Sequence, residues 1–200
     1  MEKFNFEYKD SIKKIRCIYT FNNKIGEDTF WEGYILVQNI DGILNIEGYE
    51  NDSMDSLERN GNLHLRYILG NRAISYADES LAFEIYPGNI APIHYDMHYN
   101  KEDGCFYGKW LFMPTSNHLY SSDNIDGDAF IRIEDVMVDE KEVRDIIKRI
   151  STKYKSEYSN EIEAFKLMFE LIPKRQKSLF DKDNYSIAVK KLSRFSNIIK

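Results

Sequence analysis

Apolar and polar residues alternate through most of the first 138 residues, and this period of two restricts the fold more than any other feature. Alternation of this kind is typical of strands that bury one face. Six segments keep their apolar residues in one phase: Ile15, Cys17, Tyr19 and Phe21; Trp31, Gly33, Ile35 and Val37; Leu63, Leu65, Tyr67 and Leu69; Leu81, Phe83 and Ile85; Phe106, Gly108, Trp110 and Phe112; Ala129, Ile131 and Ile133. With the segment after Gly42 and the run 93–99, the pattern predicts about eight strands.

Short turn signals separate these segments. Asp41-Gly42 lies between two apolar runs, and a two-residue hairpin loop of type I′ needs positive φ at both central residues, which favours this pair. The sequence KEDG at 101–104 gives a second turn. Consecutive strands joined in this way are antiparallel, and eight of them can close into an up-and-down barrel that has no exposed edges.

The period becomes helical after Val138. Asp139 is followed three residues later by Glu142, which is a capping pattern, and the residues Val143, Ile146, Ile147, Ile150 and Tyr154 then form one apolar stripe. A second helix is expected after Ser159 or Asn160, with Ile162 and Phe165 on its apolar side, and it should end near Pro173. A third, after Asp183, would align Tyr185, Ala188, Leu192, Phe195 and Ile199.

The fold class predicted from these patterns is α+β, with an antiparallel barrel over 1–138 and a helical segment of three helices over 139–200. The formal charge changes sign at the same boundary. Residues 1–138 carry 12 basic and 23 acidic side chains, whereas residues 139–200 carry 15 basic and 10 acidic ones. Opposite charges and the absence of a flexible Pro, Gly or Ser linker favour a helical segment docked on the barrel.

Composition excludes several classes of protein. Aromatic residues make up 14% of the chain, far above their share in disordered sequences. Two cysteines are too few for a disulfide scaffold, no run approaches the roughly 18 apolar residues of a membrane span, and the polar start lacks a secretory signal. We therefore expect a soluble cytoplasmic protein without membrane contact, while its oligomeric state stays open.

Part of the sequence resembles the calycin-type barrels, the group that contains lipocalins and avidins. The resemblance covers about residues 14–137 and rests on Trp31-Glu-Gly33, on the Asp-Gly hairpins and on Cys105-Phe-Tyr-Gly108-Lys-Trp110. It implies an eight-stranded barrel that holds one small ligand. No site motif of either family is matched, so no functional residue is transferred from them.

Aromatic residues are the leading candidates for a ligand site. Trp and Tyr combine a large apolar face with one polar group, which suits a pocket lining as well as an ordinary core. The residues on the apolar phases of separate expected strands, which closure would direct into the barrel, are Trp31, Tyr67, Tyr95, Tyr99 and Trp110. We expect them to contact a small, partly apolar or aromatic ligand if the interior is hollow.

An alternative polar site lies in PIHYDMHYN, where His94, Asp96 and His98 share one face of a strand. These side chains suit metal binding or acid–base chemistry. However, residues four apart on a strand are separated by about 13 Å, so all three cannot share one ion. We expect no metal and no cofactor, and we expect this face to be solvated while Tyr95, Met97 and Tyr99 face the core.

The remaining candidate residues are better explained by roles in packing, turns or a solvated surface than by a functional site. Cys17 and Cys105 are in or near apolar phases, and Asp123, Asp126 and Asp128 lie in a turn-rich segment without the spacing of an EF-hand. The basic residues of the tail are Lys174, Arg175, Lys177, Lys190, Lys191 and Arg194. They lack interleaved aromatic residues, which argues against nucleic acid.

Two functions from different classes follow. The first is a non-catalytic protein that binds a small ligand in the barrel. The second is a protein-interaction module, a regulator or inhibitor, that uses the acidic barrel surface or the basic tail while the interior is packed. An enzyme that uses His94, Asp96 or His98 as acid or base is a third possibility, but no nucleotide-binding, hydrolase or zinc-ribbon motif is present.

Overall fold

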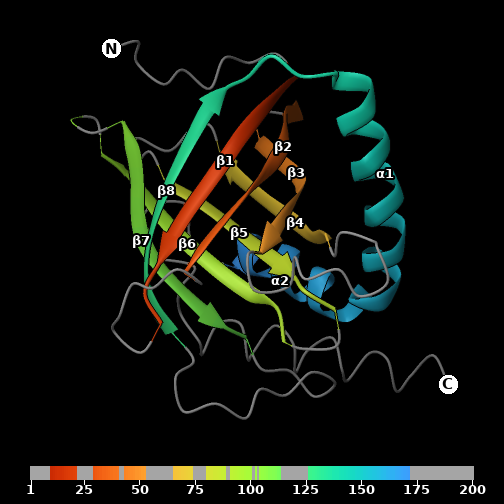
Figure 1. Ribbon diagram of the computed structural model, residues 1–200. Helices are drawn as coiled ribbons and strands as arrows, with labels where there is room; N and C mark the ends of the chain where they lie inside the picture. The colour runs from red at the N-terminus through yellow and green to blue at the C-terminus, as the bar shows by residue number, and fades with distance from the viewer. Residues whose placement is uncertain are drawn as a thin grey trace, which may run out of the picture.

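The computed structural model describes residues 10–21, 29–40, 43–52, 65–73, 80–88, 91–100, 102, 104–113 and 126–171 (Figure 1). Within these residues eight strands precede two helices. The strands are β1 (Ser11–Tyr19), β2 (Phe30–Ile40), β3 (Ile43–Asp52), β4 (Leu65–Ala73), β5 (Ser80–Tyr86), β6 (Ile93–Asn100), β7 (Cys105–Phe112) and β8 (Asp126–Asp135).

The strands form a closed antiparallel barrel in which each strand pairs with the next along the chain. Closure is made by β1 and β8, which pair from Lys13 opposite Asp135 to Tyr19 opposite Ala129. The predicted antiparallel barrel is therefore confirmed. The hairpin between β2 and β3 is also confirmed, because Ile40 pairs with Ile43 and only residues 41–42 lie between the strands.

The two ends of the barrel differ in the length of their connections. At one end, residues 41–42, 74–79 and 101–104 join the strands; at the other, residues 20–29, 53–64, 87–92 and 113–125 do so. We call these the short-loop end and the long-loop end, which are the top and the bottom of the barrel in Figure 1. Long connections on a rigid barrel are where binding residues are commonly found.

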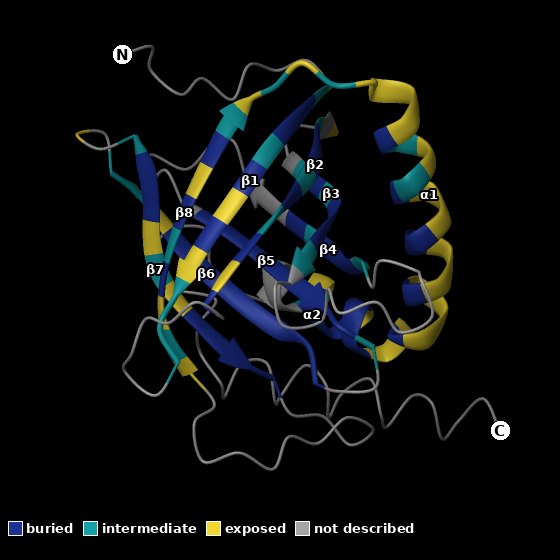
Figure 2. Cartoon of the chain, viewed as in Figure 1, coloured by how far each residue is buried: buried dark blue, intermediate teal, exposed yellow. Residues whose placement is uncertain are grey.

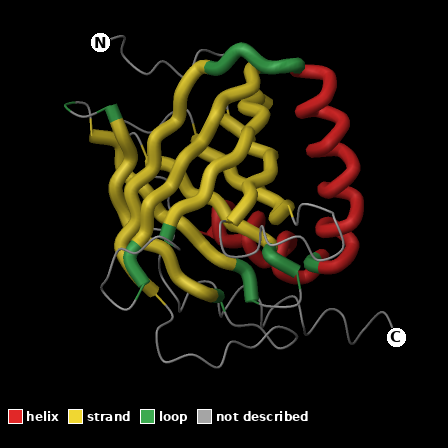
Figure 3. Tube along the Cα trace, viewed as in Figure 1, coloured by secondary structure: helices red, strands yellow, loops and turns green. Residues whose placement is uncertain are grey.

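Two helices follow the barrel: α1 (Glu140–Glu157) and α2 (Ser159–Leu171) (Figure 3). The Asp139 side chain accepts hydrogen bonds from the backbone N–H groups of Lys141 and Glu142, which confirms the predicted N-cap. The second helix also begins where the sequence indicated. The third predicted helix, after Asp183, lies outside the described residues.

Helix α1 lies against the outer face of β3 and β4, on one side of the barrel (Figure 2). Its buried residues Val143, Ile147 and Ile150 join a cluster that includes Tyr49 and Tyr67 from the barrel wall. The apolar stripe expected from the sequence is thus buried on the barrel. This second core explains why the outer face of β4 is apolar at Leu65, Tyr67 and Leu69.

The main core fills the barrel interior. Its buried members are contributed by β1, β2, β3, β4, β5, β6, β7 and β8, together with Ala91 from a connection. Interior glycines let the backbones approach closely. A Cβ at Gly33 would lie 2.0 Å from the carbonyl oxygen of Tyr49, and one at Gly108 would lie 1.9 Å from that of Asp96. Neither position can take a side chain without a backbone shift.

Candidate functional site

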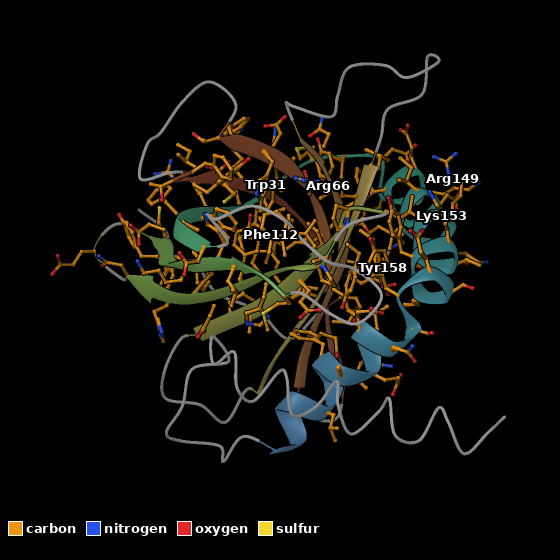
Figure 4. The ribbon with its side chains drawn as sticks, turned by 90° about the horizontal axis from the view of Figure 1, so that it is seen from below. Trp31, Arg66, Phe112, Arg149, Lys153 and Tyr158 are labelled. Carbon is orange, nitrogen blue, oxygen red and sulfur yellow. The ribbon has the colours of Figure 1, made fainter. Side chains whose placement is uncertain are left out.

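A charged pair lies inside the barrel. Glu50 on β3 and Arg66 on β4 are directly opposite each other in the strand register, and the guanidinium Nε of Arg66 donates a hydrogen bond to Oε1 of Glu50. Both residues are buried, with 0% and 6% of their surfaces exposed. Figure 4, which views the barrel from its long-loop end, labels Arg66 and Trp31, and both lie within the ring of strands.

Burial of two charges in an apolar barrel is costly in free energy. Removing each ion from water costs several kcal/mol, and the mutual attraction of the pair offsets this only with good geometry and further hydrogen bonds. A packed hydrophobic pair at the same positions would be as stable or more stable. The pair therefore needs an explanation beyond stability of the barrel.

Three further polar groups lie in the same part of the interior. The indole Nε1 of Trp31 donates a hydrogen bond to the Tyr95 hydroxyl at 3.1 Å, and the Tyr95 ring stacks on Phe83 with centroids 4.7 Å apart. The Cys17 thiol is close enough to Tyr95 to form a hydrogen bond with it. Together with the ion pair, these groups form a polar centre within the apolar core.

Burial controls the protonation of this polar centre. Desolvation raises the pKa of the Cys17 thiol well above its usual value, and the charge of Glu50 raises it further. Desolvation also raises the pKa of the Tyr95 hydroxyl, with Cys17 as the next cause. Both groups are therefore neutral at physiological pH and offer hydrogen bonds rather than a thiolate or phenolate nucleophile.

Trp110 lies near the long-loop end. Its Nε1 donates a hydrogen bond to the carbonyl oxygen of Thr20 at 3.0 Å, and its ring stacks on Phe21 with centroids 6.3 Å apart. The ring of Phe112 lies edge-on to it at 5.6 Å. Four of the five proposed ligand residues face the interior, and three of these, Trp31, Tyr95 and Trp110, lie in its long-loop half.

The other two aromatic residues are placed elsewhere. Tyr99 faces inward at the short-loop end, where its ring lies 5.0 Å from that of Phe106. A shallow hollow of about 690 Å³ is lined there by His98, Tyr99, Asn100, Glu102 and Tyr107. This hollow is at the opposite end of β6 from the polar centre.

The interior placement expected for Tyr67 is wrong. Tyr67 lies on the outer face of β4, where its ring stacks on Tyr154 of α1 at 6.1 Å and its hydroxyl donates a hydrogen bond to Glu47 at 2.7 Å. Desolvation raises the pKa of the Tyr67 hydroxyl, and Glu47 adds to this effect. The residues of β4 that point into the barrel are instead Arg66 and Ile68.

The alternative polar residues lie on the outer face of β6. Tyr95 and Met97 are buried in the interior core, as expected, and His94, Asp96 and His98 alternate with them on the outer face. The expectation that this outer face is solvated is wrong for two of the three. His94 and Asp96 are buried, with 0% and 6% exposed, whereas His98 is exposed.

Helix α2 covers His94. The His94 ring lies 5.8 Å from Phe165 of α2, and Glu161 of the same helix is buried nearby. Glu84 of β5 accepts a hydrogen bond from the Tyr86 hydroxyl at 2.6 Å. Desolvation raises the pKa of Glu84, and hydrogen bonding to His94 opposes this shift. Within the described residues no group of three or more His, Cys, Asp or Glu side chains could hold a metal ion.

The other sequence candidates have local roles where they are described. Cys105 accepts a hydrogen bond from Nε of Arg132 at 3.4 Å on the outer side of the barrel. Asp128 pairs with Lys109 of the neighbouring strand. Asp123 and the basic tail residues from Lys174 onward lie outside the described residues.

The polar centre contains residues that the sequence interpretation missed. Arg66 lies in the phase opposite to Leu65, Tyr67 and Leu69, and the alternation alone predicts that this phase faces solvent. The sequence does contain a sign that the two charges face inward. Arg66 is in phase with Ile68 and Gly70, and Glu50 is in phase with Ile46 and Gly48. Each charge ends a run of inward-facing positions.

No family model, no curated protein and no solved structure matches this chain. Among the helices of the described residues, none is long and apolar enough to cross a membrane. What the protein does is therefore inferred from its own side chains.

Proposed function

We propose that the protein is a non-catalytic binding protein whose barrel holds a small, partly aromatic ligand at the long-loop end. The observation that carries the proposal is the buried pair of Glu50 and Arg66 beside the Trp31–Tyr95 hydrogen bond. Charged and hydrogen-bonding groups within an apolar, aromatic surround are the usual composition of a small-molecule site.

The packing of the interior limits where such a ligand would bind. Trp31, Phe83 and Tyr95 contact one another in the middle of the barrel, with ring centroids 4.7 to 6.3 Å apart. A ligand would therefore bind between this layer and the long loops, against Arg66, Phe112 and Trp110. The aromatic rings would contact its apolar part, and Arg66 would orient a polar group.

Catalysis is a weaker interpretation of the same residues. The thiol of Cys17 and the hydroxyl of Tyr95 have raised pKa values, so neither is prepared as a nucleophile or base. His94 lies on the outer face beneath α2 and does not belong to the polar centre. The interior groups are suited to holding a molecule in one orientation.

The test is binding of an aromatic probe to the full-length protein. Titration with 1-anilinonaphthalene-8-sulfonate, followed by fluorescence, should give saturable binding near one probe per chain. Native mass spectrometry of the same preparation should detect any small molecule that co-purifies, as a mass lost on denaturation.

Two variants and one control locate the site. Tyr95→Phe removes only a hydroxyl, and the pair Glu50→Gln with Arg66→Met removes both charges; each should weaken probe binding at least about tenfold, equivalent to about 1.4 kcal/mol. Tyr67→Phe removes a hydroxyl from the outer face and should leave binding unchanged. Saturable binding that none of the interior variants alters would refute the proposed site.

A further inference from the structure

The two charges of the polar centre belong to one pair and add to zero. Glu50 on β3 and Arg66 on β4 form this ion pair in the long-loop half of the interior. The Cys17 thiol and the Tyr95 hydroxyl beside them are neutral, because burial raises the pKa of both groups. The polar centre therefore carries no net charge.

Among the side chains that the structure describes, no other charge lies buried in that half of the interior. The remaining buried acidic, basic and histidine side chains lie at the short-loop end (Lys13, paired with Asp135), on the outer wall (Glu84, His94 and Asp96) and on α2 (Glu161). The rings of Trp31, Tyr95 and Phe112 belong to the core that surrounds the pair. A ligand in this half would thus meet apolar rings and one neutral ion pair.

This pairing determines which ligand charge the interior can accept. A ligand with a net charge would be attracted to one member of the pair and repelled by the other at nearly the same distance, so the pair compensates little of its lost hydration. Burial would leave the ligand charge uncompensated among aromatic rings, which is strongly unfavourable. The interior therefore disfavours anions and cations alike.

A polar group without net charge fits the ion pair. A carboxylate only accepts hydrogen bonds and a guanidinium only donates them, and each can take part in several at once. A carboxamide or lactam presents an N–H donor and a carbonyl acceptor side by side, so its N–H matches Glu50 and its oxygen matches Arg66. A zwitterion also has no net charge, but it adds two ions to be desolvated, which costs far more than desolvating an amide.

We propose that the ligand is an uncharged aromatic compound whose amide-type group lies against the ion pair of Glu50 and Arg66. This inference rests on the proposed function, because it takes the ligand site to be the one between the Trp31 layer and the long loops. It adds the chemical class of the ligand. The rings of Trp110 and Phe112 contact the aromatic part, and the ion pair discriminates against ionised groups.

Three probes that share one fluorescent ring system and differ in charge test the inference. They are dansylamide, which is uncharged and has a sulfonamide donor and acceptor, dansyl sulfonate, which is anionic, and dansyl ethylenediamine, which is cationic. Fluorescence titration of the full-length wild type should give saturable binding of dansylamide near one per chain. Both charged probes should bind at least about tenfold more weakly.

A variant that unbalances the pair gives the sharper comparison, because any apolar site prefers an uncharged probe to some extent. Glu50→Gln leaves the Arg66 guanidinium, which cannot lose its proton, as an uncompensated positive charge. The preference for dansylamide over dansyl sulfonate should then fall at least about tenfold, and it should return when Arg66→Met is added. A partly unfolded variant would bind both probes more strongly, so the ratio of the two affinities is the quantity to compare.

Glu47→Gln is the matched control. It makes the same charge change on the outer face of the same strand, where Glu47 accepts hydrogen bonds from Tyr67 and Lys155. Its preference for dansylamide should stay within about threefold of that of the wild type, because changes on opposite faces of the strand act independently.

The outcomes separate this inference from the proposed function. If dansyl sulfonate binds the wild type as tightly as dansylamide does, or if Glu50→Gln and Glu47→Gln shift the preference equally, the inference about ligand charge is wrong and the binding function stands. If none of the three probes gives saturable binding, both the proposed function and the inference fail. The wild-type comparison tests the inference even if Glu50→Gln does not fold.

Discussion

Glu84 and His94 lie opposite each other on β5 and β6, with Oε1 of the carboxyl group 3.5 Å from Nδ1 of the imidazole. Both side chains are completely buried on the outer wall of the barrel beneath α2. The Tyr86 hydroxyl bonds to the same carboxyl group, and Glu161 of α2 adds a second carboxyl group to the cluster. The contact between barrel and helix therefore depends on protonation.

Glu84 should make the stability of the protein fall as pH rises. Desolvation, opposed by His94 and reinforced by Glu161, raises its pKa in the folded state above the ordinary value of 4.5. Between that value and the raised one the folded state holds a proton that the unfolded state has lost. The favourable contribution is thus complete below pH 4.5 and is lost as pH rises through the folded pKa, with a limiting slope of about 1.4 kcal/mol per pH unit.

Urea unfolding of Glu84→Gln at a series of pH values measures this effect. The difference in unfolding free energy between variant and wild type should grow in favour of the variant as pH rises above 4.5. Glu163→Gln serves as the control, because Glu163 is an exposed residue of α2 paired with Lys166. A parallel shift at all pH values would contradict the assignment to Glu84.

Docking of α1 should depend on its buried stripe and not on its exposed residues. Ile147→Ala should lower the free energy of unfolding by about 2 to 5 kcal/mol, because it leaves a cavity in the core between helix and barrel. Arg149 lies on the exposed face of the same helix, as Figure 4 shows, and Arg149→Ala should change stability by less than about 0.5 kcal/mol. Thermal unfolding of both variants checks the contrast.

Replacing one member of the interior ion pair should cost more than replacing both. Arg66→Met leaves the buried Glu50 carboxylate without its cation and should destabilise the fold by about 3 to 5 kcal/mol. The double variant Glu50→Leu with Arg66→Met should recover most of that loss. Equal stability of the single and double variants in chemical denaturation would show that the two charges are not coupled.

Gly108 should not tolerate even alanine. A Cβ at this position would lie 1.9 Å from the backbone oxygen of Asp96 on β6, so the strands would have to separate. We expect Gly108→Ala to lose at least about 1 to 3 kcal/mol of unfolding free energy, the usual cost of overpacking. Gly104 provides the comparison: it has φ of 68°, and a Cβ there would lie 3.9 Å from the Tyr99 hydroxyl, an ordinary contact, so Gly104→Asn should be tolerated. Melting temperatures of the two variants decide the point.

Strands and helices were predictable because alternation and capping are local signals. The eight strands, the two-residue hairpin at 41–42 and the N-cap at Asp139 all follow from neighbouring residues. Closure of the barrel could be predicted from the number of strands and from the short turns between them. None of these predictions depended on knowing which distant segments of the chain meet.

It was harder to predict which face of each strand points into the barrel. A strand face that is buried under a helix and one that is buried in the barrel interior both carry apolar side chains. In β4 the apolar phase of Leu65, Tyr67 and Leu69 is outside, under α1, and the phase with Arg66 is inside. In β6 the polar face is buried because α2 covers His94. A single sequence cannot reveal such a reversal until the helices are placed, and this is why the interior ion pair was missed.

Closure of the barrel through β1 and β8 has a consequence for synthesis of the chain. Lys13 and Asp135 form an ion pair across the first and last strands, 122 residues apart. Until the ribosome has released the end of β8, β1 remains a bare edge able to pair with other chains. The helices and the tail follow only afterwards, so this edge stays unpaired until nearly the whole barrel has been synthesised.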